Sequence, residues 1–289
     1  MSRLLVTGGA GYLGRRLGPL AAAQGWQVTS TYFSTPPLAG EAVPLDLTDG
    51  PAVHALVTAL RPTAIIHTAC SNRNAAHIAA ILPAARHLAE AAQAVGARLV
   101  HVSTDMVFDG EHAPYADDAP LGPLTDYAAA KAEAERVVLA ACPGAAVGRP
   151  SLIWSLDPLD KQTEWLVAGM RRGERVTLFT DEVRCPIHLD DLAAALLALA
   201  ARPELSGPFN LGGQQALSRW EFGLRLLEAL GLPRSANVLP GTVAGSGLRR
   251  PRDLTLQLTR ATHAGLPPLR GVEEVLAAHA QHAPRICEG

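Results

Sequence analysis

The chain has 289 residues, of which 48% are hydrophobic and 18% charged, and its formal net charge is −2. This composition predicts one large or two smaller folded domains and excludes an intrinsically disordered chain. Because the charge is nearly balanced, we expect no nucleic-acid partner. The four scattered cysteines form no C-x-x-C pair, so we expect neither a metal site nor a disulfide framework.

The hydropathy pattern offers no membrane-crossing segment. The longest apolar run, Leu192 to Ala201, is about ten residues and too short to cross a bilayer. A strand-like run begins at Leu4, which leaves no room for a signal peptide before it. We therefore expect a cytoplasmic protein without a membrane partner.

The first 150 residues alternate between short β-type apolar runs and stretches of helical periodicity. The expected strands are Leu4–Thr7, Val28–Tyr32, Ala64–His67, Leu99–Val102 and Ala145–Val147. The expected helices are Leu13–Gln24, Pro51–Leu60, with Asp49 as its cap, Ala75–Val95 and Tyr127–Ala141. This alternation predicts an α/β fold with a doubly wound parallel sheet of the Rossmann type.

The pattern changes after residue 150. Expected helices are Thr163–Arg172, Asp190–Ala201 with Asp190 or Asp191 as its cap, Ser218–Leu230, Thr259–Ala264 and Val272–His282. Strands are expected at Arg175–Phe179 and Pro208–Leu211, and loops at Ser151–Lys161 and Pro240–Pro251. We expect residues 1–150, rejoined by about 187–211, to form a dinucleotide-binding domain. Residues 151–289, mainly 151–186 and 212–289, would form a smaller substrate-binding domain, with the active site between the two.

A glycine-rich segment joins the first expected strand to the first helix. Gly8, Gly11 and Gly14 have the spacing G-x-x-G-x-x-G. Gly8 would permit the tight turn, Gly11 the close approach of a pyrophosphate, and Gly14 the packing of helix on strand. The phosphate would bind at the positive end of the helix. The segment therefore predicts a dinucleotide cofactor.

The second strand ends without the carboxylate that binds the ribose hydroxyls of NAD. Arg15 and Arg16 follow the glycine segment and would reach a 2′-phosphate, so the sequence favours NADP(H) over NAD(H). Asp46 lies where the third strand would end, in position to bind the adenine amino group.

Three residues suggest carbonyl chemistry. Thr104 follows the strand Leu99–Val102, at the sheet edge where open parallel sheets bind ligands. Tyr127 and Lys131 are four residues apart on one helix face, about 6 Å along the axis. An ammonium there would lower the pKa of the tyrosine from about 10 and let it exchange a proton with a substrate oxygen. Thr104 would hold the same oxygen.

The set Thr7–Gly14, Ser103–Thr104 and Tyr127-x-x-x-Lys131 resembles the extended short-chain dehydrogenase/reductase family. The segments 103–110 and 123–127 resemble its dTDP-4-dehydrorhamnose reductase branch, which also contains the methionine adenosyltransferase regulatory β subunit. The resemblance implies an NAD(P)H-dependent reductase of a 4-keto-6-deoxy sugar nucleotide, with Tyr127 as general acid, Lys131 on the nicotinamide ribose and Thr104 on the carbonyl. It implies further cofactor contacts at Tyr12, Leu13, Thr31, Leu47, Thr68, Ala69 and Pro150, and substrate contacts at Asp105, Arg184 and Arg252.

The chain departs from that branch near the expected substrate site. The segment 70–75 lacks the usual lysine and glutamate, and Leu152 replaces an aromatic residue. Trp154 and Trp165 are either sugar-stacking or core residues. Further residues of interest fall into two sets. The arginines that would suit a diphosphate are Arg184, Arg249, Arg250 and Arg252. The histidines expected to be satisfied core residues are His67, His87, His101 and His188.

Two other functions remain open. The wider family includes epimerases and dehydratases that hold NAD tightly, and a cofactor-binding regulatory subunit without catalysis is the third hypothesis. We expect a small-molecule partner, a nucleotide sugar, and leave a homodimer open.

Overall fold

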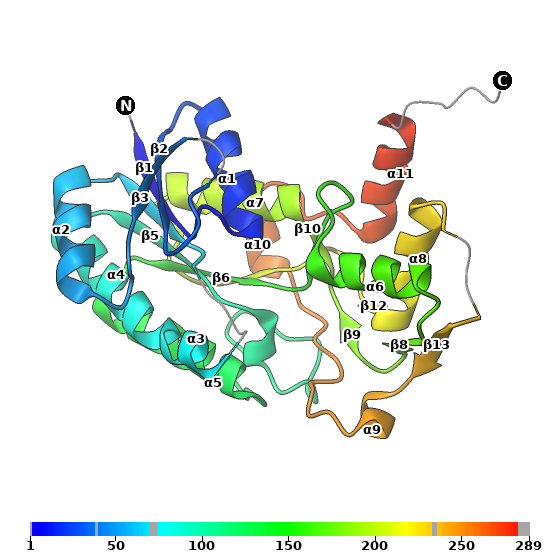
Figure 1. Ribbon diagram of the computed structural model, residues 1–289. Helices are drawn as coiled ribbons and strands as arrows, with labels where there is room; N and C mark the ends of the chain where they lie inside the picture. Colours follow the sequence, from blue (N-terminus) through cyan, green and yellow to red (C-terminus); the bar gives the residue numbers. More distant parts are fainter. Residues whose placement is uncertain (1, 38–39, 70–73, 233–235, 283–289) are drawn as a thin grey trace.

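The computed structural model describes residues 2–37, 40–69, 74–232 and 236–282. Its central layer is a seven-stranded sheet in the order β11-β6-β5-β4-β1-β2-β3 (Figure 1). The strands are β1 (Arg3–Thr7), β2 (Gln27–Tyr32), β3 (Glu41–Pro44), β4 (Ala64–His67), β5 (Arg98–Val102), β6 (Ala146–Pro150) and β11 (Gly207–Leu211). All neighbouring strands run parallel, which confirms the predicted fold class.

Helices cover both faces of the sheet because its strands are apolar on both sides. One face packs on α1 (Tyr12–Ala23), α7 (Leu189–Ala201) and α10 (Thr259–His263). The other packs on α2 (Gly50–Leu60), α4 (Ile81–Val95) and α5 (Asp126–Ala141). Alternation along β1 sets this division, since Leu4 and Val6 contact the first group and Leu5 the second.

The expected helix Ala75–Val95 is two helices, α3 (Ala75–Ala79) and α4, which meet at Ala80. Pro83 explains the break, because its ring clashes with the carbonyl of residue 79 and it donates no hydrogen bond. The cap expected at Asp49 is confirmed, since its carboxylate accepts from Ala52 N at 3.0 Å.

The remaining segments form a smaller group of elements beside the carboxyl edge of the sheet (Figure 1). Its strands are β7 (Ile153–Trp154), β8 (Val176–Phe179), β9 (Val183–Arg184), β10 (Ile187–His188), β12 (Leu217–Ser218) and β13 (Val238–Gly241). Its helices are η1 (Asp105–Val107), α6 (Lys161–Arg171), α8 (Arg219–Ala229), α9 (Val243–Ser246) and α11 (Val272–His282). Both expected loops were partly wrong: the first contains β7 and the second contains α9. The β7 strand exists through pairing with the distant β10, which local sequence does not reveal.

The sheet is rejoined late in the chain, since β11 pairs with β6 and α7 packs on the same face as α1. The position of the boundary between the two expected domains stays a prediction. The expected cap of α7 was wrong: the helix is capped by His188, whose ring accepts from Asp190 N. Asp190 pairs instead with Arg16, and Asp191 pairs with Arg270.

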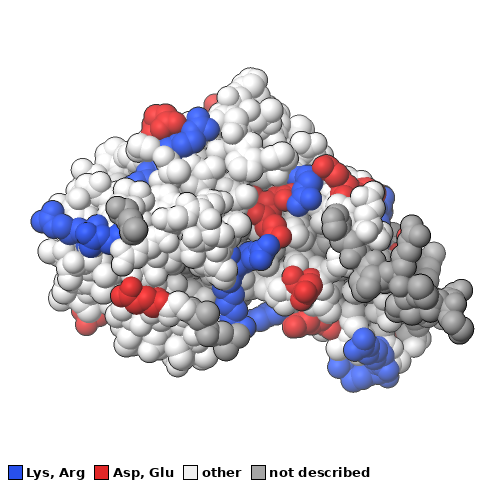
Figure 2. Space-filling model, turned by 90° about the horizontal axis from the view of Figure 1, so that it is seen from above, with Lys and Arg blue, Asp and Glu red and all other residues white. Residues whose placement is uncertain are grey.

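Charge is interspersed over the face drawn in Figure 2, where basic and acidic side chains lie next to each other. Within the described ranges, no helix has both the length and the apolar character that a membrane crossing requires.

Candidate active site

The glycine segment forms a tight turn at the end of β1. Gly8 has a φ of 73°, in the left-handed region that glycine adopts at little cost. A Cβ on Gly14 would lie 2.2 Å from the carbonyl oxygen of Gly8, so this position of α1 packs directly on the turn. Helix α1 begins at Tyr12 after Gly11, which has no side chain to cap the first N–H groups. This helix end therefore fits a phosphate group.

The residues expected near the adenosine of a dinucleotide differ in their contacts. Asp46 is exposed, and two hydrogen bonds from Thr48, led by that of its hydroxyl, lower the pKa of its carboxyl. Arg15 is exposed and makes no side-chain hydrogen bond or ion pair with the described part of the chain. Arg16 is paired with Asp190 through two contacts of 2.5 and 2.7 Å. The pair uses Nε and Nη2 and leaves Nη1 without a contact in the described part of the chain, so the expected role of Arg16 at a 2′-phosphate stays a prediction.

The other expected cofactor residues line the same sheet edge. Thr68 donates to Thr7 O at 2.6 Å, and Ala69 N donates to Thr7 Oγ1 at 3.3 Å. Tyr12 donates to Pro158 O at 3.2 Å, and burial is the first cause that raises the pKa of its phenol. The remaining expected positions, of which Leu47 is half-buried and the others are buried, are Leu13, Thr31, Leu47 and Pro150. The segment 70–73 lies outside the described residues.

The structure brings Thr104, Tyr127 and Lys131 together where β5 ends and α5 begins. Thr104 is buried and caps η1, and its hydroxyl accepts from Met106 N at 3.3 Å. Helix α5 packs against η1 and carries the half-buried Tyr127 in its first turn. Lys131 is buried and its Nζ donates to Val102 O at 2.5 Å, which anchors the ammonium under the end of β5. The catalytic roles of these residues stay a prediction.

Two buried histidines lie beside Lys131, on neighbouring positions of β4 and β5. The rings of His67 and His101 are 5.1 Å apart, and His67 Nδ1 is hydrogen-bonded to Thr7 Oγ1 at 2.8 Å. Burial, with the charge of Lys131, lowers the pKa of His67 to about 3 and that of His101 well below its usual value. His67 is a satisfied core residue, as expected. His101 is not, because neither ring nitrogen has a partner among the described residues.

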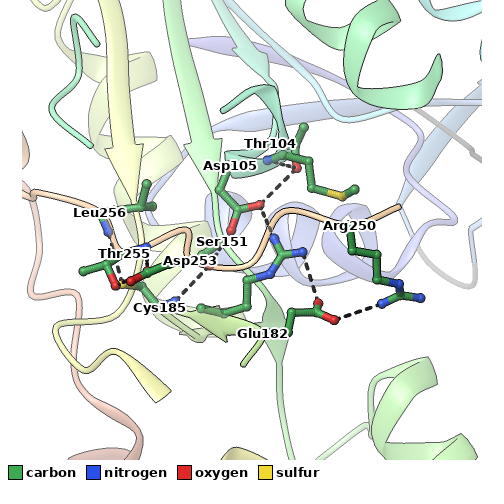
Figure 3. Close-up of polar contacts among 11 residues, drawn as sticks. Thr104, Asp105, Ser151, Glu182, Cys185, Arg250, Asp253, Thr255 and Leu256 are labelled. Atoms are coloured by element: carbon green, nitrogen blue, oxygen red, sulfur yellow. Dashed lines mark hydrogen bonds and ion pairs between the residues drawn. The ribbon is translucent and has the colours of Figure 1, made fainter. Parts of the chain in front are cut away.

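A buried charge network, here named the junction cluster, joins the end of β5 to β9. It consists of Asp105, Ser151, Glu182, Arg184 and Arg250. Arg184 donates to Asp105 at 3.0 Å and to Glu182 at 3.3 Å, and Arg250 donates to Glu182 at 3.2 Å. Figure 3 shows these contacts running from Thr104 and Asp105 to Glu182 and Arg250. The two expected substrate ligands Asp105 and Arg184 are thus bound to each other.

An open pocket of about 470 Å³ adjoins this cluster at α9. Its polar lining comes from Arg249, Arg250, Arg252 and Glu111. Arg252 is paired with Glu111 at 2.6 Å, and its guanidinium is more than half exposed. Of the two tryptophans considered for sugar stacking, Trp154 is buried in the core with Phe222, whereas Trp165 is half exposed.

Sequence reasoning missed Ser151 and Glu182. Ser151 donates to Asp105 at 2.7 Å and accepts from Cys185 N at 3.2 Å. It therefore connects the end of β6 and the end of β9 to the cluster. Neither residue belongs to a motif with a recognisable spacing; only the arginines in the same segments indicated that a counter-charge was needed. No group of three or more metal-ligating side chains occurs within the described ranges.

Comparison with known proteins identifies the family. A family model described as the RmlD substrate binding domain matches residues 2–284. A dTDP-4-dehydrorhamnose reductase of Streptomyces griseus is 33% identical over 309 residues, which cover 99% of this chain and 94% of that protein. The methionine adenosyltransferase 2 subunit beta of Bos taurus is 30% identical, with 95% and 87% covered.

Solved structures share the fold. The dTDP-4-dehydrorhamnose reductase of Bacillus anthracis, in complex with NADP, superposes with a TM-score of 0.83 at 23% identity, covering 96% of this chain and 98% of that one. The Bordetella bronchiseptica enzyme WbmG, in complex with NAD, gives 0.83 at 21% identity, with 96% and 93% covered. Because the family model spans nearly the whole chain, the protein belongs to the RmlD substrate binding domain family, within the extended short-chain dehydrogenase/reductase fold.

Proposed function

We propose that the protein is an NADPH-dependent reductase that converts a 4-keto-6-deoxy sugar nucleotide to its alcohol. The observation that carries the proposal is that Thr104 follows β5, Lys131 is bound to the end of β5, and Tyr127 lies one turn before Lys131 on α5. A phenol, a hydroxyl and a buried ammonium are the groups that carbonyl reduction requires. The relative from Streptomyces griseus, a dTDP-4-dehydrorhamnose reductase, supports the same substrate class.

Tyr127, Thr104 and Lys131 have separate roles in the proposed reaction. A reduced nicotinamide, when bound, supplies the hydride that reaches the carbonyl carbon. Tyr127 gives its phenolic proton to the carbonyl oxygen, so that no free alkoxide has to form. Thr104 donates a hydrogen bond to the same oxygen and fixes its direction. Lys131, held by Val102 O, places a positive charge near the tyrosine and the ribose of the cofactor.

The preference for NADPH rests on the end of β2 and on α1. No carboxylate follows Thr31 to bind ribose hydroxyls, and the first carboxylate near the adenine side is the exposed Asp46. Arg15 makes no ion pair with the described residues, whereas Nε and Nη2 of Arg16 are bound to Asp190. The expected discrimination therefore depends chiefly on Arg15.

The pocket at α9 supports a diphosphate-bearing substrate. Arg249, Arg250 and Arg252 face it with only Glu111 among its lining carboxylates, which leaves excess positive charge. Guanidinium groups match pairs of phosphate oxygens. Through Glu182 and Arg184 this pocket is connected to Asp105, the neighbour of Thr104, so a substrate with its diphosphate at α9 would extend toward the reactive site.

A second candidate is a regulatory subunit that binds the cofactor without catalysis. It is favoured by relatives described as methionine adenosyltransferase 2 subunit beta, at 29 to 32% identity. It predicts cofactor binding with no turnover, and a stable complex with a methionine adenosyltransferase catalytic subunit.

The experiment that tests the proposal follows the reduced-nicotinamide absorbance with dTDP-4-dehydrorhamnose, with NADPH and NADH in parallel. Faster loss of NADPH signal is expected. Tyr127→Phe should lower turnover by about 10²- to 10⁴-fold while cofactor binding, read by nicotinamide fluorescence, is unchanged. The control is Tyr32→Phe, since the Tyr32 hydroxyl makes no hydrogen bond within the described residues.

Full turnover by Tyr127→Phe would contradict the assignment of the general acid. Cofactor binding without turnover by the native protein would favour the regulatory candidate, which pull-down with the catalytic subunit then decides. A bound nicotinamide that co-purifies and returns to its oxidised state in each cycle would favour an epimerase or dehydratase.

A further inference from the structure

We propose that Arg184 is a positioning residue for carbonyl reduction, which acts by neutralising Asp105 and so leaves the Thr104 hydroxyl available to the substrate oxygen. The inference rests on the proposed reductase function and assigns a second task within that site. It replaces the expectation that Arg184 and Asp105 are substrate ligands.

The geometry around Asp105 shows where its carboxylate oxygens are used. Oδ1 accepts from Arg184 Nη1 at 3.0 Å, and Oδ2 accepts from Ser151 at 2.7 Å. The side chains of Asp105 and Arg184 are only 3% and 9% exposed, so water does not screen the pair. The contact from Thr104 Oγ1 to Oδ1 is 3.4 Å, the longest of the three.

The direction of the Thr104 hydroxyl proton decides whether Thr104 can serve the substrate. Met106 N donates into its oxygen at 3.3 Å, so one lone pair is occupied and the proton must point elsewhere. A carboxylate without Arg184 would be a stronger acceptor for that proton and would compete with the substrate. Arg184 and Ser151 satisfy Asp105, which weakens that competition.

The Asp105 carboxylate also affects the energy of the transition state. Hydride addition moves negative charge onto the carbonyl oxygen, beside Thr104 and therefore near Asp105. An unpaired carboxylate in a buried site would oppose this charge, whereas a paired one is nearly neutral from outside. Arg184 thus lowers the barrier without touching the substrate.

The contacts of Arg184 distinguish it from a substrate ligand. Its Nη1 and Nη2 are both used within the cluster, and its Nε is buried without a partner among the described residues. Arg250, by contrast, is nearly half exposed and lines the pocket at α9. Arg250 is therefore suited to contact a diphosphate, whereas Arg184 is suited to pair with Asp105 and Glu182.

The test is a double-variant cycle with NADPH and dTDP-4-dehydrorhamnose, comparing the native enzyme, Arg184→Met, Asp105→Asn and the double variant. Arg184→Met should lower kcat by about 10- to 100-fold with KM changed less than about threefold, a smaller loss than removal of a direct oxyanion donor. Asp105→Asn should stay within about fivefold of native kcat. The double variant should recover most of the lost kcat, because it removes the charge that Arg184 neutralises.

Stability and cofactor binding are measured on each variant by thermal unfolding and nicotinamide fluorescence. Arg184→Lys keeps the charge and should retain more kcat than Arg184→Met, and it covers the case in which Arg184→Met does not fold. The control is Arg172→Met, which breaks an exposed ion pair with Glu174 that is not part of the junction cluster.

The outcomes separate the inference from the proposed function. A double variant as slow as Arg184→Met overturns the inference alone, and so does a KM rise of tenfold or more with unchanged kcat, which would mark Arg184 as a substrate ligand. If Arg184→Met does not fold, the test uses Arg184→Lys and the double variant. The inference is then overturned if both fold and both lose kcat by the same factor, because the rate would not depend on the charge at residue 184. A native enzyme that binds cofactor but reduces no substrate overturns the proposed function, and the inference with it.

Discussion

The glycine turn and the junction cluster both border the proposed active site, yet they are built in different ways. The turn depends on backbone geometry: Gly8 has a positive φ, and Gly14 allows α1 to approach the carbonyl of Gly8. The junction cluster depends on buried charge, in which Asp105 and Arg184 meet across 79 residues of sequence. The glycine turn needs residues without side chains. The junction cluster needs oppositely charged side chains that are far apart in the sequence and meet in the folded protein.

The difference teaches where a sequence is informative. A backbone turn requires a particular residue type at a particular spacing, so it leaves a motif. A buried ion pair requires only that two opposite charges meet in the folded state, and its members carry no spacing. If the two regions differ in energy and in pH response as they differ in construction, substitutions in them should have unequal effects.

The largest expected effect is acid destabilisation that begins on the glycine-turn side, where His67 and His101 are buried. In the folded state the pKa of His67 is about 3, against about 6.5 in the unfolded chain. Between these values the unfolded state binds more protons, so this contribution to stability is complete above pH 6.5 and is lost as the pH falls toward 3. The loss is about 1.4 kcal/mol per pH unit for each such histidine.

Urea unfolding at pH 7, 6 and 5 measures this slope. The variant His67→Gln should flatten this pH dependence, because it removes the buried imidazole. An unchanged slope in His67→Gln would show that other groups cause the acid sensitivity, and the contrast between the two regions would weaken.

The next effect is the loss of a carboxylate from the junction cluster. Glu182→Ala should lower the free energy of unfolding by about 3 kcal/mol, because it leaves the buried Arg184 without one of its two partners. Arg184 keeps Asp105, which places the cost at the lower end of the usual range. Chemical denaturation checks it, and Glu174→Ala, which breaks an exposed pair with Arg172, should leave the unfolding temperature unchanged. A loss equal to that of the control would mean that the cluster is not held by its charges.

A smaller effect is expected from a methyl group in the glycine turn. Gly14→Ala should cost about 1–3 kcal/mol, because its Cβ would lie 2.2 Å from Gly8 O and the turn must shift. It should also weaken NADPH binding, read by fluorescence titration. Gly18→Ala, in the same helix with nothing within 4 Å of its Cβ, should cost less than Gly14→Ala, since its methyl group meets only the ring of the following Pro19. Equal effects of the two substitutions would remove the argument from backbone geometry.

Much of the fold was predictable, since six of the seven strands of the parallel sheet and the helices α1, α2 and α5 follow from hydrophobic periodicity and from caps such as Asp49. The edge strand β3 was not among the expected apolar runs. The split at Ala80 was missed because Pro83 acts on the residue four positions earlier. The short β7 was missed because its pairing partner is distant.

The site was predictable only in part. Spacing and context selected Thr104, Tyr127 and Lys131, and the structure places them where β5 ends and α5 begins, while their catalytic roles stay a prediction. The ion pair of Arg16 with Asp190 was not foreseen because the two residues lie 174 positions apart. Glu182 and Ser151 were missed for the same reason, as no local pattern shows which charges and hydroxyls will meet.

The smallest expected effect concerns His101, where the two kinds of construction conflict. Its position on β5 is buried as in an apolar core, yet it is a polar ring whose nitrogens have no partner in the described chain. An unsatisfied buried polar group costs about 1–3 kcal/mol, so His101→Leu should raise the free energy of unfolding at pH 7 by about 1 kcal/mol, after allowance for imperfect fit. Equilibrium denaturation measures the change, with His67→Leu as the matched variant. Because His67 does have a partner, Thr7, that change should destabilise. A destabilised His101→Leu would contradict the prediction, because it would show that the ring stabilises the fold although its nitrogens have no partner in the described chain.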